Sequence, residues 1–116
     1  METVHVFVST GRFGSFQEMR AFIDPTYTED GDAVPSVFMR EVRLSGFEPG
    51  CIEAIHSERA VPLAELLAGT SYSDQWLKYL DGSRRADAAI CVFAPNRVGN
   101  PESSSLEYCG VFSYKP

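Results

Sequence analysis

Two short segments made almost entirely of apolar and β-branched residues constrain this sequence most. Residues 4–8 are apolar on both faces apart from His5, and residues 86–94 are nearly continuous apolar strand material. Strands that are buried on both faces lack the alternation of apolar and polar residues seen in half-exposed strands. The sequence therefore predicts a central strand at residues 4–8 and a second buried strand at residues 86–94.

Helical patterns occupy much of the chain between these strands. Apolar residues recur at helical spacing over residues 15–24, where Ser15 and Glu18 form a capping box and Pro25 ends the helix. A second short helix is expected over residues 35–43, beginning at Pro35. Two further helices are expected, one opened by Pro62 and closed by Gly69, the other capped by Ser71 or Ser73.

Two more strands complete the predicted fold. Residues 51–56 indicate a flanking strand, and residues 106–114 form a final strand expected to pair antiparallel with residues 86–94 through a long polar loop. The order β-α-α-β-α-α-β-β is typical of an α+β two-layer sandwich, with a mainly antiparallel sheet of about four strands and about four helices. At 116 residues, we expect residues 1–116 to form a single domain.

Charge is distributed unevenly along the chain. Acidic residues outnumber Lys and Arg by 16 to 10, and residues 1–60 hold most of the excess. Phosphate ligands require basic side chains, so we expect no nucleic-acid partner. The sequence contains no apolar run long enough to cross a membrane, and its start lacks the features of a signal peptide. Because the three cysteines leave one unpaired in any disulfide scheme, we expect a reduced, cytoplasmic setting.

The acidic stretch at residues 27–39 is the most distinctive motif. Glu29, Asp30 and Asp32 surround Gly31 and precede a predicted helix. Their carboxylates are hard oxygen ligands, but the spacing does not fit an EF-hand loop, so we expect no metal. An exposed turn explains the same residues, with the carboxylates complementing the dipole of the following helix.

Candidate catalytic residues do not form a recognisable constellation. The possible nucleophiles are Cys51, Cys91, Cys109 and the serines at 103–105, and the histidines are His5 and His56. No nucleophile elbow is present, and Cys51 and His56 are predicted to point to opposite faces of one strand. Buried cysteines are inert by default. Surface glutamates at positions 53, 58, 102 and 107 lack a pocket signature. We therefore expect neither an enzyme nor a cofactor.

Three separated segments carry distinctive motifs. They are Tyr27-x-Glu29-Asp30-Gly31-Asp32-x-x-Pro35-Ser36-x-Phe38-Met39, Gly69-x-Ser71-Tyr72-Ser73-x-Gln75, and Ser103-Ser104-Ser105-Leu106 with Gly110-Val111-Phe112-x-Tyr114. Together with the opening Val4-x-Val6-Phe7-Val8, these motifs resemble the polymorphic-toxin immunity protein 22 family, and the resemblance covers nearly the whole chain.

This resemblance implies a bacterial protein that binds and neutralises a cognate toxin, often a nuclease-type effector used in competition between cells. The implied mechanism is occlusion, in which an acidic face docks on a basic active-site cleft. Glu29, Asp30 and Asp32 would supply the charge, and Tyr27 and Tyr72 would supply aromatic anchors. Tyr72 also fits a core position, because it shares a helical stripe with Trp76.

Two other readings remain open from the sequence. The chain could be a non-catalytic homo-oligomeric module in which an exposed sheet edge forms a homodimer. Less favoured is a small metal-binding protein or enzyme.

Overall fold

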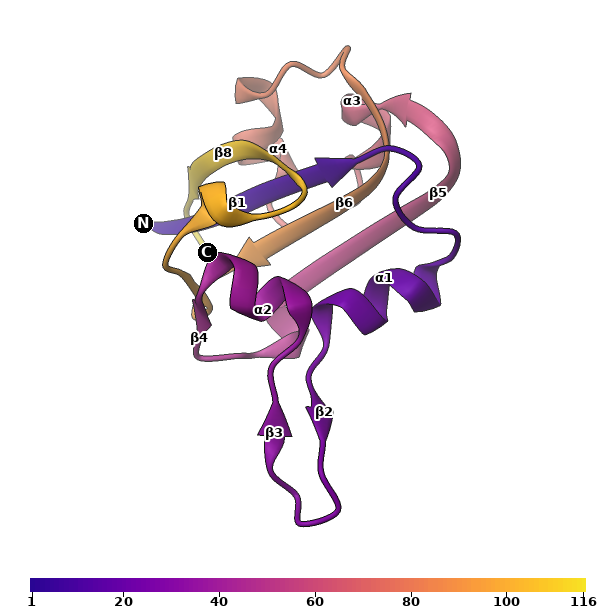
Figure 1. The fold of residues 1–116 in the computed structure, drawn as a ribbon. Helices are drawn as coiled ribbons and strands as arrows, with labels where there is room; N and C mark the ends of the chain where they lie inside the picture. Colours follow the sequence, from indigo (N-terminus) through magenta and orange to yellow (C-terminus); the bar gives the residue numbers. More distant parts are fainter.

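Strand β1, at the N-terminus, lies inside a four-stranded antiparallel sheet with the order β5-β6-β1-β8. The computed structural model describes residues 1–116 (Figure 1). The strands of this sheet are β1 (Glu2–Ser9), β5 (Ile52–Pro62), β6 (Arg85–Phe93) and β8 (Glu107–Tyr114). The two segments expected to be buried strands, residues 4–8 and 86–94, therefore correspond to the two inner strands, although β6 ends one residue earlier, at Phe93. These strands pair with Val6 opposite Cys91.

The helices divide between the two faces of the sheet (Figure 1). Helices α1 (Phe16–Ile23) and α2 (Val37–Val42) pack on one face, and the short helices α3 (Leu63–Leu66) and α4 (Ser73–Trp76) pack on the other. The α+β class and the element order are confirmed. The expected two layers are corrected to a sheet with a helical layer on each side.

The division of the helices follows from the inner strands. Val4, Val6 and Val8 point into a core shared with α3 and Trp76. Phe7 lies on the opposite face, in a core shared with α1 and α2. Because apolar side chains on both faces must be removed from water, the sheet needs a cover on each side.

The pairing of the last strand differs from the expectation. Strand β8 pairs antiparallel with β1, and the second neighbour of β6 is β5. The predicted pairing of residues 106–114 with residues 86–94 is therefore wrong. The loop after β6 carries the chain past β1, and Cys109 forms a bulge where the β1–β8 register shifts beside Gly110, whose φ is 130°.

Several short elements were not predicted. Strands β2 (Thr26–Tyr27) and β3 (Ala33–Val34) form a hairpin, and β4 (Leu44–Ser45) pairs with β7 (Arg97–Val98). Single 3₁₀ turns occur at Pro49–Cys51, Leu77–Tyr79 and Pro101–Ser103. Two-residue strands carry too few residues for a periodic pattern to mark them.

Helix ends follow the sequence signals in part. Ser15 caps α1 by accepting from the Glu18 N–H at 3.1 Å, but the Glu18 carboxylate accepts from Gly14 N–H rather than from Ser15. Asp24 ends the helix in an extended conformation, as the following proline requires. Helix α4 is capped by neither Ser71 nor Ser73.

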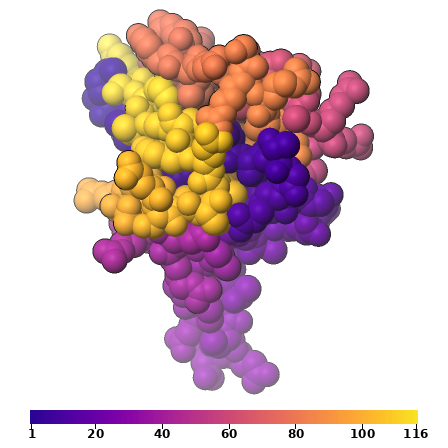
Figure 2. Space-filling view, turned by 45° about the horizontal axis from the view of Figure 1, so that its top comes forward, coloured from indigo at the N-terminus to yellow at the C-terminus, as the bar shows by residue number.

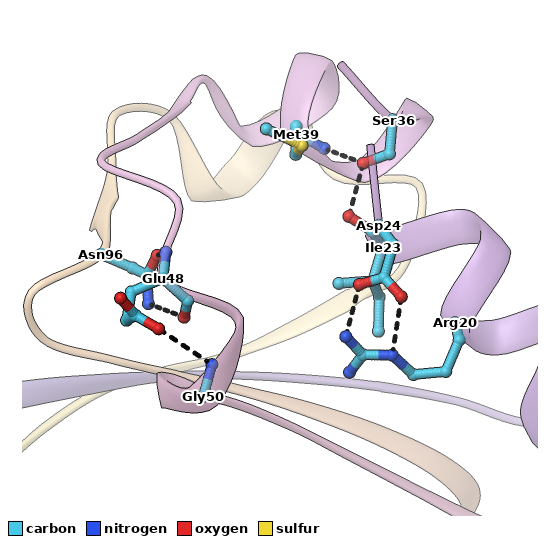
Figure 3. A network of polar contacts seen from close by, with 8 residues as sticks. All are labelled: Arg20, Ile23, Asp24, Ser36, Met39, Glu48, Gly50 and Asn96. Atoms are coloured by element: carbon cyan, nitrogen blue, oxygen red, sulfur yellow. Dashed lines mark hydrogen bonds and ion pairs between the residues drawn. The ribbon is translucent and has the colours of Figure 1, made fainter. Parts of the chain in front are cut away.

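Ser36 joins the end of α1 to the start of α2 (Figure 3). Its buried hydroxyl donates to the Ile23 carbonyl at 2.7 Å and accepts from the Met39 N–H at 3.1 Å. It is the N-cap of α2, so the helix begins two residues later than predicted from Pro35. Beside it, Arg20 and Asp24 form an ion pair. The β2–β3 hairpin leaves and re-enters the protein body between these two anchored helix ends.

His5 is the polar exception in the apolar part of β1. Its Nδ1 lies 2.9 Å from the Tyr108 hydroxyl on β8, and the ring is half-buried. Burial lowers the pKa of His5 below its ordinary value, because the charged imidazolium is poorly solvated there. The residue therefore links two strands of the sheet through its contact with Tyr108.

We predict that Ser36→Ala lowers the free energy of unfolding by about 1–2 kcal/mol, because it removes a helix cap and leaves the buried Ile23 carbonyl without its donor. Urea denaturation of the two proteins measures the difference. Ser45→Ala, at an exposed position, is the matched control and is expected to change stability little. Equal losses in both variants would contradict the anchoring role of Ser36.

We also predict that the protein loses stability as pH falls below about 6.5, the ordinary histidine pKa. Below this pH the histidine takes up a proton more readily in the unfolded chain than in the folded protein, because folding lowers the pKa of His5. The contribution of His5 to the free energy of unfolding is therefore present in full above about pH 6.5 and is lost on acidification. His5→Gln should show a smaller loss of unfolding free energy between pH 7.5 and pH 5.5 than the parent, whereas the exposed-site variant Ser45→Ala should show the same loss as the parent. If the pH dependence of stability is the same in His5→Gln as in the parent, His5 is not the source of the loss.

Candidate functional site

The acidic stretch forms the tip of the β2–β3 hairpin. Thr28 N–H donates to the Asp32 carbonyl and Gly31 N–H donates to the Thr28 carbonyl, both at 2.9 Å. Gly31 has φ 86°, the left-handed conformation that closes a three-residue hairpin loop of this kind. Thr28 Oγ1 also accepts from Asp32 N–H at 3.1 Å. The turn is thus held by backbone bonds, and its carboxylates are left free.

The hairpin projects from the protein body as a finger, seen at the bottom of Figure 1 and Figure 2. Glu29, Asp30 and Asp32 are all exposed at its tip, and none of them forms an ion pair. The expectation that these carboxylates complement the dipole of the following helix is wrong, because the first turn of α2 contains no acidic residue. The exposed turn itself was expected, but its placement at the end of a hairpin was not.

Apolar side chains accompany the charges on the hairpin. Tyr27 on β2 is 66% exposed, although it lies opposite Ala33 in the hairpin ladder. Val34 and Val37, at the other side of the hairpin and the start of α2, are also exposed. Exposed aromatic rings such as that of Tyr27 are enriched at protein-binding surfaces relative to the rest of a protein surface.

Tyr72 lies away from this hairpin. It immediately precedes α4, which covers the opposite face of the sheet from α1 and α2. Its ring stacks on Tyr114 with the ring centroids 4.6 Å apart, and the side chain remains partly exposed. Trp76 is fully buried, as a core position requires, whereas Tyr72 is not. The two residues therefore do not share one buried helical face. The structure therefore groups four of the five predicted binding residues and separates the fifth.

A small cleft of about 250 Å³ opens beside Tyr72, and we call it the Tyr72 cleft. It lies where the start of β1, the start of β5 and the ends of β6 and β8 meet. Its lining includes Glu2, Glu53, Ser71, Tyr72, Phe93 and Tyr114. Sequence patterns gave no sign of this cleft, because its residues come from five separate segments. The sequence indicates only a surface carboxylate at Glu53, and the fold places that carboxylate beside Tyr72.

The candidate nucleophiles are dispersed. Cys91 is buried, and burial raises its pKa far above the ordinary thiol value. Burial also raises the pKa of Cys109. Cys51 packs against the core shared with α3, whereas His56 on the other face donates from Nε2 to the Phe13 carbonyl at 3.0 Å. The predicted separation of Cys51 and His56 holds.

No three His, Cys, Asp or Glu side chains come together in a geometry that could hold a metal ion. No helix of the protein is both long and apolar enough to span a membrane.

Comparison with known families matches residues 6–115 to the family described as Immunity protein 22. The match covers nearly the whole chain and includes the hairpin and Tyr72. No curated protein and no solved structure matches the chain.

Proposed function

Because this chain belongs to the immunity protein 22 family, we propose that it binds and neutralises a cognate bacterial toxin by placing the β2–β3 hairpin over the toxin's active site. The family supports the immunity role and the binding of a toxin. We further propose that the hairpin occludes the active site and that the toxin is a nuclease-type protein with a basic cleft.

The projecting hairpin is the observation that carries this proposal. It is the element of the molecule that extends furthest from the protein body (Figure 1), and a finger of this shape fits a concave active site. Its base is held by Ser36 and by the Arg20–Asp24 pair, so little backbone order has to be gained on binding. Tyr27 would pack against the wall of the toxin's cleft as an aromatic anchor.

Charge supports the same role. The three tip carboxylates form no ion pair within the protein, so their negative charge is available to a partner. A nuclease cleft is lined by Lys and Arg that bind phosphates, and three carboxylates on a hairpin tip offer comparable charges. Such complementarity accelerates association and selects the partner. We propose that the protein is non-catalytic and acts in the cytoplasm of the cell that makes it.

We predict that the triple variant Glu29→Gln, Asp30→Asn, Asp32→Asn binds the toxin encoded beside its gene about tenfold or more weakly than the parent, mainly through a slower association rate. The substitutions keep side-chain shape and remove only charge. Surface plasmon resonance at two salt concentrations measures the rate, and the difference between variant and parent should shrink at high salt.

The control variant Glu58→Gln, Glu65→Gln, Glu102→Gln removes the same charge from exposed positions away from the hairpin. It should bind almost like the parent. Equal weakening in both variants would mean that net charge alone matters, and unchanged binding in the hairpin variant would remove the hairpin from the interface. Failure of the parent to protect cells that express the toxin would refute the immunity role itself.

A homo-oligomeric module is the alternative function, and one observation favours it. Strand β8 is an outer strand of the sheet, and Val111 on it is 50% exposed. An open edge with an exposed apolar side chain can pair with a second copy. Under this alternative, light scattering gives a dimer mass, Val111→Lys gives a monomer, and co-expression with the toxin gives no protection.

A further inference from the structure

We propose that the Tyr72 cleft receives an arginine side chain of the protein's partner. This inference rests on the proposed function only for the identity of that partner, the toxin. The cleft and the hairpin belong to different sides of the sheet, so the contribution of each to binding can be measured separately.

The aromatic side of the cleft is a fixed stack. Tyr114 is buried, and Phe93 packs edge-on against it at 5.5 Å between ring centroids. Tyr72 stacks almost parallel on Tyr114, with an angle of 18° between the rings, and its centroid also lies 6.4 Å from that of Phe93. Tyr72 is 39% exposed, so part of its ring remains open to a ligand. A guanidinium group is attracted to such an aromatic face.

The polar side of the cleft is negative. Glu53 Oε1 accepts from the Ser71 N–H at 3.1 Å, which fixes the carboxylate, and Oε2 accepts no hydrogen bond. Glu2 lines the same cleft from the start of β1, and no lining residue carries a positive charge. Burial, and to a smaller extent the charge of Glu2, raises the pKa of Tyr114. A planar cation with several N–H donors satisfies this arrangement.

The size of the cleft favours one inserted side chain. Small-molecule pockets usually enclose about 300–1,000 Å³, and this cleft of about 250 Å³ falls below that range. Its rim is also held in place. Asn96 Nδ2 donates to the Glu48 carbonyl at 3.1 Å, and Asn96 Oδ1 accepts from the Glu48 N–H at 2.7 Å (Figure 3). This pair ties together the two loops that border the cleft after β6 and before β5.

The backbone of Tyr72 supports a role for its ring. Its φ of 58° and ψ of 19° place it in the left-handed region, which favours glycine or asparagine. A tyrosine in this sparsely populated backbone region costs stability. Use of the exposed ring in binding gives a reason for tyrosine at this position.

The first experiment tests the chemistry of the cleft without the toxin. The protein is titrated with N-acetylarginine amide while backbone amide shifts are followed by NMR, and N-acetylcitrulline amide is the uncharged probe of the same shape. We expect saturable shifts at Ser71, Tyr72 and Tyr114 with the arginine probe, and none with citrulline. Glu53→Gln keeps an acceptor for Ser71 and should weaken binding of the arginine probe about fivefold, as loss of one partly exposed charge pair implies.

Glu65→Gln, on the exposed side of α3, is the matched control and should bind the arginine probe like the parent. The inference is overturned if no saturable shift occurs at the cleft, if citrulline gives the same shifts, or if Glu53→Gln binds as tightly as the parent. These outcomes do not depend on the toxin.

The second experiment identifies the source of the arginine. Tyr72→Ala and Glu53→Gln are each expected to weaken toxin binding about tenfold, as loss of an interface anchor does. Combined with the hairpin triple variant, their effects should add, because the two surfaces share no residue. If toxin binding is unchanged in both variants, the arginine that enters the Tyr72 cleft does not come from the toxin. If the parent fails to bind the toxin while the arginine probe binds the cleft, the proposed function fails and the chemistry of the cleft stands.

Discussion

The fold depends on burial of two adjacent inner strands on both of their faces. Along β1, Val6 points to one side of the sheet and Phe7 to the other, and both are fully buried. On β6, Ile90 and Cys91 divide in the same way. Each fully buried side chain of this size contributes about 1.5–3 kcal/mol, but only if a covering layer excludes water from that face. The two helical layers follow from this requirement.

The two covering layers give the protein two different surfaces. The layer of α1 and α2 is interrupted by the hairpin, which begins and ends at helix termini fixed by Ser36. The layer of α3 and α4 is short, and it leaves the ends of the strands open at the Tyr72 cleft. Both surfaces are acidic and both carry an exposed tyrosine. They differ in shape. The hairpin projects and suits a concave surface of a partner, whereas the Tyr72 cleft is hollow and suits a protruding side chain.

Helices and inner strands could be predicted because their signals are local. Ser15 and Asp24 mark the ends of α1 within a single segment, and the apolar runs of β1 and β6 need no knowledge of their neighbours. Strands of two residues leave no periodic pattern, so the sequence predicts Glu29 and Asp32 in a turn before a helix and not at the end of a hairpin. The partner of β8 was misassigned because strand pairing depends on where the long loop after β6 travels.

The sequence alone determined the α+β class, the order of elements and the family, because each rests on patterns within continuous segments. It also determined that Glu29, Asp30 and Asp32 lie together at an exposed turn, since residues so close in the chain remain close in any fold. Only the tertiary structure decided that Tyr72 stands apart from them and beside Glu53 and Tyr114. Those contacts join residues far apart in the chain, and they exist only once the ends of the strands have been brought together by the packing of the sheet.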